Sequence, residues 1–286
     1  MQKANPDIIE SLDQSIFKSS YPVGGNILLL NFDELAKSDV IKHIPILSVF
    51  NALYKGVLGI CDRFFLRKVV LFINQFNSGL STLEIQKFVS DVLTDKKFRD
   101  KVNEKILILL DRFDDEFKAL ILAELLKSWV RGDIDWNTFQ RLTNTVERCH
   151  PDVFKYLYDF HKAHSCGSDF MQLGMFPPNE SSLIVCSGLG SIEHDTQLKI
   201  WSDALFLCNN ALKVLLDDQY QKFPSELDQY LKDNREEVLN NCPFSWYERE
   251  LLHWRIDMGV GLYQELRKDF ANKIGACISE INRKKS

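Results

Sequence analysis

The chain has 286 residues and a mass of 33.2 kDa, with 45% apolar and 26% charged residues. This composition is ordinary for a globular protein and excludes a mainly disordered chain. The 35 basic and 40 acidic residues give a net charge of −5, so there is no global attraction to nucleic acid or to anionic membranes.

The first part of the chain is predicted to be a series of short-looped amphipathic helices. Ser81 and Glu84 form a capping box, Asp135 suits an N-cap, and Pro151 suits a first helical turn. Short loops favour an antiparallel helical array, which we assign to a first domain of residues 1–166. The helices are expected at residues 5–19, 45–60, 62–77, 81–93, 96–112, 115–130, 136–148 and 151–163.

A second segment, residues 167–218, is richer in small and polar residues. Two short strands are predicted at 182–187 and 197–202, with a glycine-containing hairpin loop at 188–196. An apolar helix is predicted to follow at 203–216. Helices, a hairpin and a closing helix form a winged-helix-like order, so we expect a mainly α fold with one small β hairpin.

The third segment, residues 219–286, is predicted to end in a long helix. Ser245 and Glu248 form a capping box, and apolar residues then recur at alternating steps of four and three to about residue 282. This seam needs a partner surface, either the protein's own body or a second copy. We predict docking or self-association through Trp246, Trp254, Tyr263, Leu266, Phe270 and Ile274.

The seven cysteines are odd in number and scattered, which predicts buried reduced thiols in a cytoplasmic protein. No apolar targeting segment is found in residues 1–10. The one dense Cys/His cluster offers a weak zinc candidate, but a helix of eleven residues would separate its first two members by about 16 Å. We therefore predict no metal and no cofactor. The four residues are Cys149, His161, His164 and Cys166.

The acidic clusters of the chain are explained better by helix capping and turns than by a catalytic or metal-binding site. The carboxylates at 111–116 are favoured by the dipole of a helix start. Asp133 and Asp135 resemble half of a calcium loop, but Thr138 occupies the position of its glycine. No phosphate-binding loop, zinc-protease motif or nucleophile elbow occurs in the chain, so we do not expect an enzyme.

The sequence leaves two further functional classes open. Residues 44–73 form the most apolar region, and its insertion into a membrane is an alternative that we favour less than burial in a core. Binding of nucleic acid by the winged-helix-like segment is a second alternative. Residues 181–218 contain two lysines against five acidic residues, which disfavours phosphate binding.

One stretch resembles a known family. His43-Ile44-Pro45-Ile46, followed by Ile60-Cys61-Asp62-Arg63-Phe64-Phe65-Leu66-Arg67-Lys68, is similar to a motif pair of a widespread family of uncharacterised prokaryotic helical proteins. The resemblance covers roughly residues 40–215. It implies a bacterial, helical, non-catalytic protein, and we associate such proteins with mobile or phage-defence genes. The expected function is therefore a protein-interaction or regulatory role.

Overall fold

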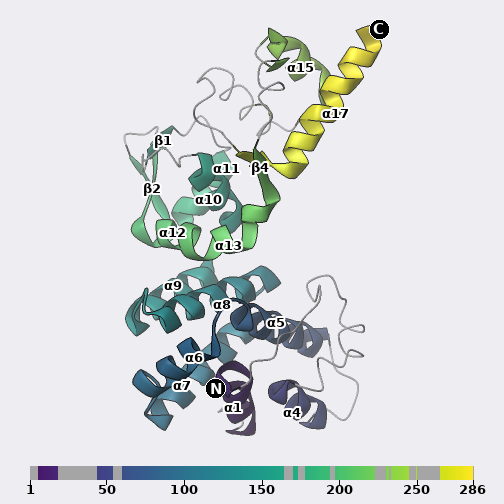
Figure 1. Cartoon of the computed structure of the whole chain (residues 1–286). Coiled ribbons are helices and arrows are strands. Elements are labelled where there is room, and N and C mark those ends of the chain that lie inside the picture. Colours follow the sequence, from purple (N-terminus) through teal and green to yellow (C-terminus); the bar gives the residue numbers. More distant parts are fainter. Residues whose placement is uncertain are drawn as a thin grey trace. The chain divides into compact units, whose positions relative to one another are not determined.

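The computed structural model describes residues 6–18, 44–53, 60–163, 170–172, 178–193, 197–222, 230–231, 233–244, 249 and 265–285. The chain divides into two compact units, unit 1 (Met1–Arg148) and unit 2 (Cys149–Ser286), which are described separately (Figure 1). The described residues are mainly helical with small antiparallel sheets, which confirms the predicted fold class. The predicted division into three segments at 166 and 218 stays a prediction.

Unit 1 is helical throughout its described part. Its predicted caps are present: Ser81 and Glu84 form the capping box, and the Asp135 side chain accepts a hydrogen bond from Thr138 N. Asp115, which was not predicted as a cap, accepts a hydrogen bond from Phe117 N. In chain order the elements are α1 (Pro6–Asp13), the π-helical turn η1 (Gln14–Lys18), α4 (Pro45–Leu53), α5 (Ile60–Asn77), α6 (Thr82–Asp91), α7 (Lys96–Arg112), α8 (Glu116–Arg131) and α9 (Trp136–Arg148).

Helix α8 is the centre of unit 1. Every residue from Lys118 to Val130 is buried, and the helix packs against α5 and α9. Near its end the Trp129 ring contacts Phe88 edge-on at 4.9 Å between centroids and stacks on Phe139 at 5.4 Å. A helix buried on all sides needs hydrogen-bond partners for every polar group that it carries.

Two cations of α8, the buried Lys127 and the exposed Arg131, bind carbonyl groups just after the end of α5. Lys127 Nζ lies 2.9 Å from the Ser78 carbonyl oxygen, just after α5, and 2.6 Å from Glu124 Oε1. Arg131 donates to the Gly79 carbonyl oxygen at 2.9 Å. The last carbonyls of a helix have no partner within it, so these donors complete α5 and fix its position along α8.

Two more lysines act in the same way. Lys68 on α5 donates to the carbonyl oxygens of Phe113 at 2.5 Å and Asp111 at 3.3 Å, where α7 ends. Lys118 on α8 donates to the Glu147 carbonyl oxygen, at the end of α9, at 3.1 Å. Burial lowers the pKa of Lys68 and of Lys127, while neighbouring carboxylates act against this shift.

The described part of the apolar region 44–73 lies inside unit 1. Ile44, Ile46 and Leu47 are buried, and so is most of the stretch from Leu66 to Ile73. Among the described residues, no helix combines the length and the apolar character needed to cross a bilayer. Membrane insertion of these side chains would require unit 1 to open.

Unit 2 combines helices with two small sheets (Figure 1). Its elements are α10 (Asp152–Ala163), β1 (Phe170–Gln172), α11 (Pro178–Cys186), β2 (Gly190–Glu193), β3 (Gln197–Ile200), α12 (Ser202–Leu207), the π-helical turn η4 (Cys208–Leu212), α13 (Lys213–Leu216), the 3-10 turn η5 (Asp217–Gln219), β4 (Tyr220–Lys222), α15 (Arg235–Asn241), β5 (Glu265–Arg267) and α17 (Lys268–Lys285).

The winged-helix-like hairpin is present, but its first strand is not where it was predicted. Strands β2 and β3 pair antiparallel, and β1 adds to β3 to give the order β1-β3-β2. Residues 182–187, predicted as a strand, belong to the end of helix α11 and its cap. A short apolar run does not distinguish a strand from a buried helix, and tertiary packing decided for the helix.

The two glycines that flank Leu189 explain this arrangement. Gly188 has φ of +71° and ends α11, where Leu189 N donates to the Ile184 carbonyl oxygen at 3.1 Å. A Cβ on Gly190 would lie 2.5 Å from the Lys199 carbonyl oxygen on β3. Glycine is therefore needed twice: first to end the helix, then to admit the neighbouring strand.

The terminal helix is shorter than predicted. Glu265–Arg267 forms strand β5, paired antiparallel with β4, so α17 begins at Lys268 rather than near 245. Helical spacing of apolar residues continues through 265–267, but pairing with a strand distant in the chain overrides it. Eighteen residues give α17 a length of about 27 Å.

The prediction of buried reduced thiols is wrong in two respects: Cys186 is exposed, and one pair of cysteines is oxidised. Cys242 and Cys277 form a disulfide, with Cα atoms 5.9 Å apart and a sequence separation of 35. Closing a loop of that length removes entropy from the unfolded chain worth about 4 kcal/mol. The tertiary structure brings these two residues together, and the spacing of the cysteines gives no sign of it.

We predict that Lys127→Met strongly destabilises unit 1. The substitution leaves the buried Glu124 carboxylate without its cation and the Ser78 carbonyl without its donor, which costs about 3–5 kcal/mol. Native-state hydrogen exchange of the α8 amides measures this loss in unit 1 alone. Lys87→Met, at an exposed position of α6, is the matched control and should stay within about 0.5 kcal/mol of the parent. A loss below about 1 kcal/mol for Lys127→Met would contradict the prediction.

Two glycine-to-alanine changes are expected to act in opposite directions. Gly132 ends α8 with φ of +83° and has open space around it, so Gly132→Ala should cost about 1–2 kcal/mol through backbone strain alone. Gly275 lies inside α17, also in open space, so Gly275→Ala should stabilise that helix by about 0.5–1 kcal/mol. Hydrogen exchange of α8 and α17 reports the two effects separately, and effects of equal sign would refute this explanation.

Candidate interaction site

The predicted C-terminal interaction residues are described in part. Phe270 and Ile274 lie on α17 and are buried, with exposed fractions of 6% and 0%. The Phe270 ring packs edge-on against Phe244, with centroids 5.8 Å apart. These two side chains thus contact their own unit, and their role in docking stays a prediction. Leu266 lies in β5, and Trp246, Trp254 and Tyr263 lie outside the described residues.

The zinc candidates are also described in part. Cys149 is buried just before α10, and His161 lies in the last turn of α10. His164 and Cys166 lie outside the described residues. Within the part of the chain that the structure describes, no group of three or more His, Cys, Asp or Glu side chains is placed to hold a metal ion.

His161 instead takes part in a polar contact with the helix that follows the hairpin. Burial lowers its pKa, a hydrogen bond with the Asn209 side chain opposes the shift, and the charges of Lys162 and Lys213 add to it. Tyr158, one turn before His161 on α10, donates to Asp217 Oδ1 at 2.8 Å. Lys162, the residue after His161, has its Nζ 2.6 Å from the same oxygen. The two bonds join α10 to the end of α13, and they hold the pKa of Asp217 below its usual range.

The thiol of Cys208, in the π-helical turn, is not suited to nucleophilic chemistry. Its Sγ contacts the Leu157 carbonyl oxygen at 3.7 Å in the interior of unit 2. Burial raises the pKa of this thiol far above its ordinary value, so it remains protonated at neutral pH. We assign it a packing role between α10 and η4.

Three of the acidic residues at 111–116 stabilise the start of α8 as predicted, whereas Asp111 lies in the last turn of α7. Asp115 caps α8 by accepting a hydrogen bond from Phe117 N at 2.7 Å. Asp114 pairs with Lys118 at 2.6 Å, and Glu116 pairs with Arg67 at 2.7 Å. These carboxylates stabilise the start of α8 and its contact with α5.

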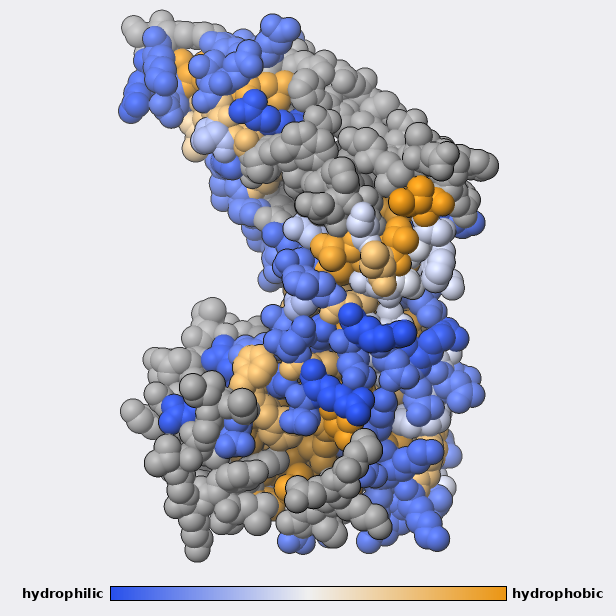
Figure 2. Space-filling model, turned by 180° about the vertical axis from the view of Figure 1, so that it is seen from behind, coloured by the Kyte–Doolittle hydropathy of each residue, from blue (hydrophilic) through white to orange (hydrophobic). Residues whose placement is uncertain are grey.

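The β2–β3 hairpin exposes two large apolar side chains that the sequence analysis did not single out. Ile192 on β2 is 47% exposed, and Trp201, directly after β3, is 46% exposed. Trp201 Nε1 donates to Ser191 Oγ at 3.2 Å, and its backbone N donates to the Leu189 carbonyl oxygen at 3.0 Å. We call Ser191, Ile192 and Trp201 the hairpin surface. Apolar residues reach the surface of unit 2 in the view of Figure 2.

The alternation along β3 accounts for the position of Trp201. Leu198 and Ile200 are buried, so the residues between and after them, Lys199 and Trp201, point to the opposite face. This period of two was the sequence signal for an outward-facing tryptophan. The sequence analysis treated Trp201 as one more apolar residue of a predicted strand and did not use its position in the alternation.

The charge of the chain is distributed unevenly between the units. Residues 1–148 contain 20 basic and 20 acidic residues, so the net charge of −5 belongs entirely to residues 149–286. The hairpin surface therefore lies in an acidic unit. Such a unit repels phosphate groups and attracts basic protein surfaces.

Comparison of the chain with protein-family models, with curated proteins and with solved structures gives no match.

We predict that the imidazole of His161 titrates below 6.5 and that two neighbours shift its pKa in opposite directions. Asn209→Ala removes a bond that raises the pKa and should lower it further, whereas Lys213→Met removes a repelling charge and should raise it. NMR titration of the imidazole measures both, with His161→Gln assigning the signal. Because the unfolded chain binds the proton at higher pH than the folded chain does, the contribution of His161 to the stability of unit 2 is present above about pH 6.5 and is lost as the pH falls below the pKa of the folded state. Shifts of the same sign in both variants would contradict this account.

Proposed function

We propose that this chain is a non-enzymatic protein-interaction or regulatory protein that contacts its partner through the hairpin surface of unit 2. The observation that carries the proposal is the exposed Trp201 ring, held on the hairpin by its hydrogen bond to Ser191. Tryptophan is enriched among the residues that dominate interface energetics. A ring that is already fixed loses little conformational freedom when it is buried by a partner.

The acidic character of unit 2 supports a protein partner with a basic rim. The segment 181–218, which contains the hairpin, holds Lys199 and Lys213 against five carboxylates. Complementary charge around an aromatic centre raises the association rate and selects among partners. The same charge disfavours a nucleic-acid backbone.

The contacts of the charged side chains named below support a role without catalysis. Lys68, Lys118 and Lys127 bind helix-end carbonyls, and Asp217 joins two helices of unit 2. A catalytic group needs a free position for a substrate atom within hydrogen-bond reach. The hydrogen-bonding positions around these side chains are taken by other groups of the protein.

We predict that Trp201→Ala lowers partner binding at least tenfold without unfolding the hairpin. Truncating an interface tryptophan at a hot spot typically costs about 2 kcal/mol or more, which corresponds to about thirtyfold in affinity. The measurement is quantitative retention of the partner from cell extract on immobilised full-length chain, followed by titration of the purified partner.

Val214→Ala is the matched control for this experiment. Val214 is also a large exposed apolar residue of unit 2, but it lies on α13, outside the hairpin surface. It should retain the partner within twofold of the parent. Hydrogen exchange of β2 and β3 checks that Trp201→Ala keeps the hairpin intact. Equal retention by Trp201→Ala and the parent would refute the proposed site, and an equal loss in both variants would also refute it.

A further inference from the structure

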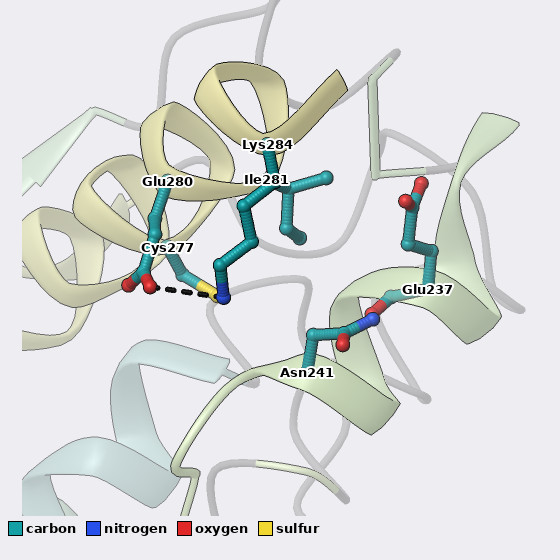
Figure 3. A pocket seen from close by; sticks show the side chains of 6 residues that line it. All are labelled: Glu237, Asn241, Cys277, Glu280, Ile281 and Lys284. Atoms are coloured by element: carbon teal, nitrogen blue, oxygen red, sulfur yellow. Dashed lines mark hydrogen bonds and ion pairs between the residues drawn. The ribbon is translucent and has the colours of Figure 1, made fainter. Parts of the chain in front are cut away.

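The disulfide of unit 2 lies at a surface groove between two helices. The groove, about 360 Å³ including its open mouth, lies between α15 and α17 (Figure 3). Cys277 is among its lining residues, whereas its partner Cys242 is not. Lys284 also lines the groove and pairs with Glu280 at 3.1 Å. A small molecule in the groove therefore reaches one sulfur of the pair.

Helix α15 depends on this cross-link more than α17 does. It has seven residues, too few for a stable helix in isolation, and its buried apolar side chains are Val238 and Leu239. The residue after it, Cys242, is covalently joined to the middle of α17. Close by, the Phe244 ring packs on Phe270. Helix α17, in contrast, has eighteen residues and six buried positions along its length.

We propose that Cys242 and Cys277 are a redox latch, which low-molecular-weight thiols of the glutathione class open through the groove, thereby releasing α15 from α17. The latch is independent of the hairpin surface and would regulate the end of unit 2. Cys186 and Cys208 are thiols in the same unit, so unit 2 contains both reduced and oxidised cysteines. Such a mixture suits a disulfide that exchanges with its surroundings.

The exchange conserves atoms and electrons. The thiolate of the first small thiol attacks Cys277 Sγ, forms a mixed disulfide with it and expels Cys242 as a thiolate. A second small thiol attacks the small-molecule sulfur of the mixed disulfide, giving the small disulfide and the Cys277 thiolate. Two electrons pass from the two small thiols to the protein, and the two protons of the small thiols end on Cys242 and Cys277. Glutathione disulfide drives the reverse reaction.

The test is a redox titration of the full-length chain in mixtures of reduced and oxidised glutathione. Alkylation followed by peptide mass spectrometry measures the free fraction of each cysteine, and hydrogen exchange measures the opening of α15. We expect Cys242 and Cys277 to become reduced together and reversibly. The trapped mixed disulfide should lie on Cys277 at least fivefold more often than on Cys242, and the α15 amides should exchange at least tenfold faster after reduction, with α10 unchanged.

Two variants make the result specific. Cys186→Ser removes an exposed thiol outside the pair and should leave the titration unchanged. The double variant Cys242→Ser/Cys277→Ser should show the exchange of the reduced chain in every mixture; if it does not fold, the reduced parent still gives the comparison. The latch is refuted if the pair is already free without reductant, resists the most reducing mixture, reacts preferentially at Cys242, or opens without a change in α15.

Discussion

The structure of unit 1 depends on buried cations that bind the carbonyl ends of neighbouring helices. When helices are packed into a core, their last carbonyl groups lose water, and each needs a donor from elsewhere. Lys68, Lys118 and Lys127 supply donors at the ends of α7, α9 and α5, so each of these three ends is completed by a side chain of another helix. An ammonium group at a helix C-terminus is also favoured by the helix dipole. The position of α8 relative to α5 and α9 is therefore set by a few directional bonds as well as by apolar packing.

In unit 2 the same requirement is met by backbone geometry. Gly188 ends α11 in a left-handed conformation, and Gly190 admits the backbone of β3 at close range. These two positions fix where the hairpin leaves the helices. The alternation along β3 then turns Leu198 and Ile200 inward and Trp201 outward. The exposure of Trp201 thus follows from the register of the hairpin, which the two glycines fix. The proposed function rests on this exposed side chain.

Among the described residues at the end of unit 2, α15 contributes two buried apolar side chains, Val238 and Leu239, and the Cys242–Cys277 bond joins its end to α17. Helix α15 is too short to persist without its neighbour, and Tyr230 adds a hydrogen bond to Asn282 at 3.0 Å. A segment with so small a local core has a low free energy of opening unless it is cross-linked. The proposed latch depends on this low free energy of opening. Reduction of the two sulfur atoms releases α15, while α10 and the hairpin keep their own contacts.

The sequence by itself determined the helical class and the helices with strong local signals. The bounds of α7 and α9 agree with their predicted ranges 96–112 and 136–148, because caps and apolar spacing act within a few residues of each other. It also predicted that the carboxylates of Asp114, Asp115 and Glu116 lie at a helix start. Of the candidate site, it predicted a strand over 197–202, whereas β3 ends at Ile200 and Trp201 follows it, and it did not predict that the ring is exposed.

Tertiary structure alone decided the features that join distant residues. Strand β5 interrupts a helical pattern because β4 offers it hydrogen bonds, and residues 182–186 are helical because of what packs around them. Cys242 and Cys277 are 35 positions apart in the sequence. The buried lysines are 29 to 49 positions from the residues whose carbonyl groups they bind; these lysines are Lys68, Lys118 and Lys127. Local propensity is encoded by neighbours in sequence, whereas these bonds depend on which groups the folded chain brings within about 3 Å of each other.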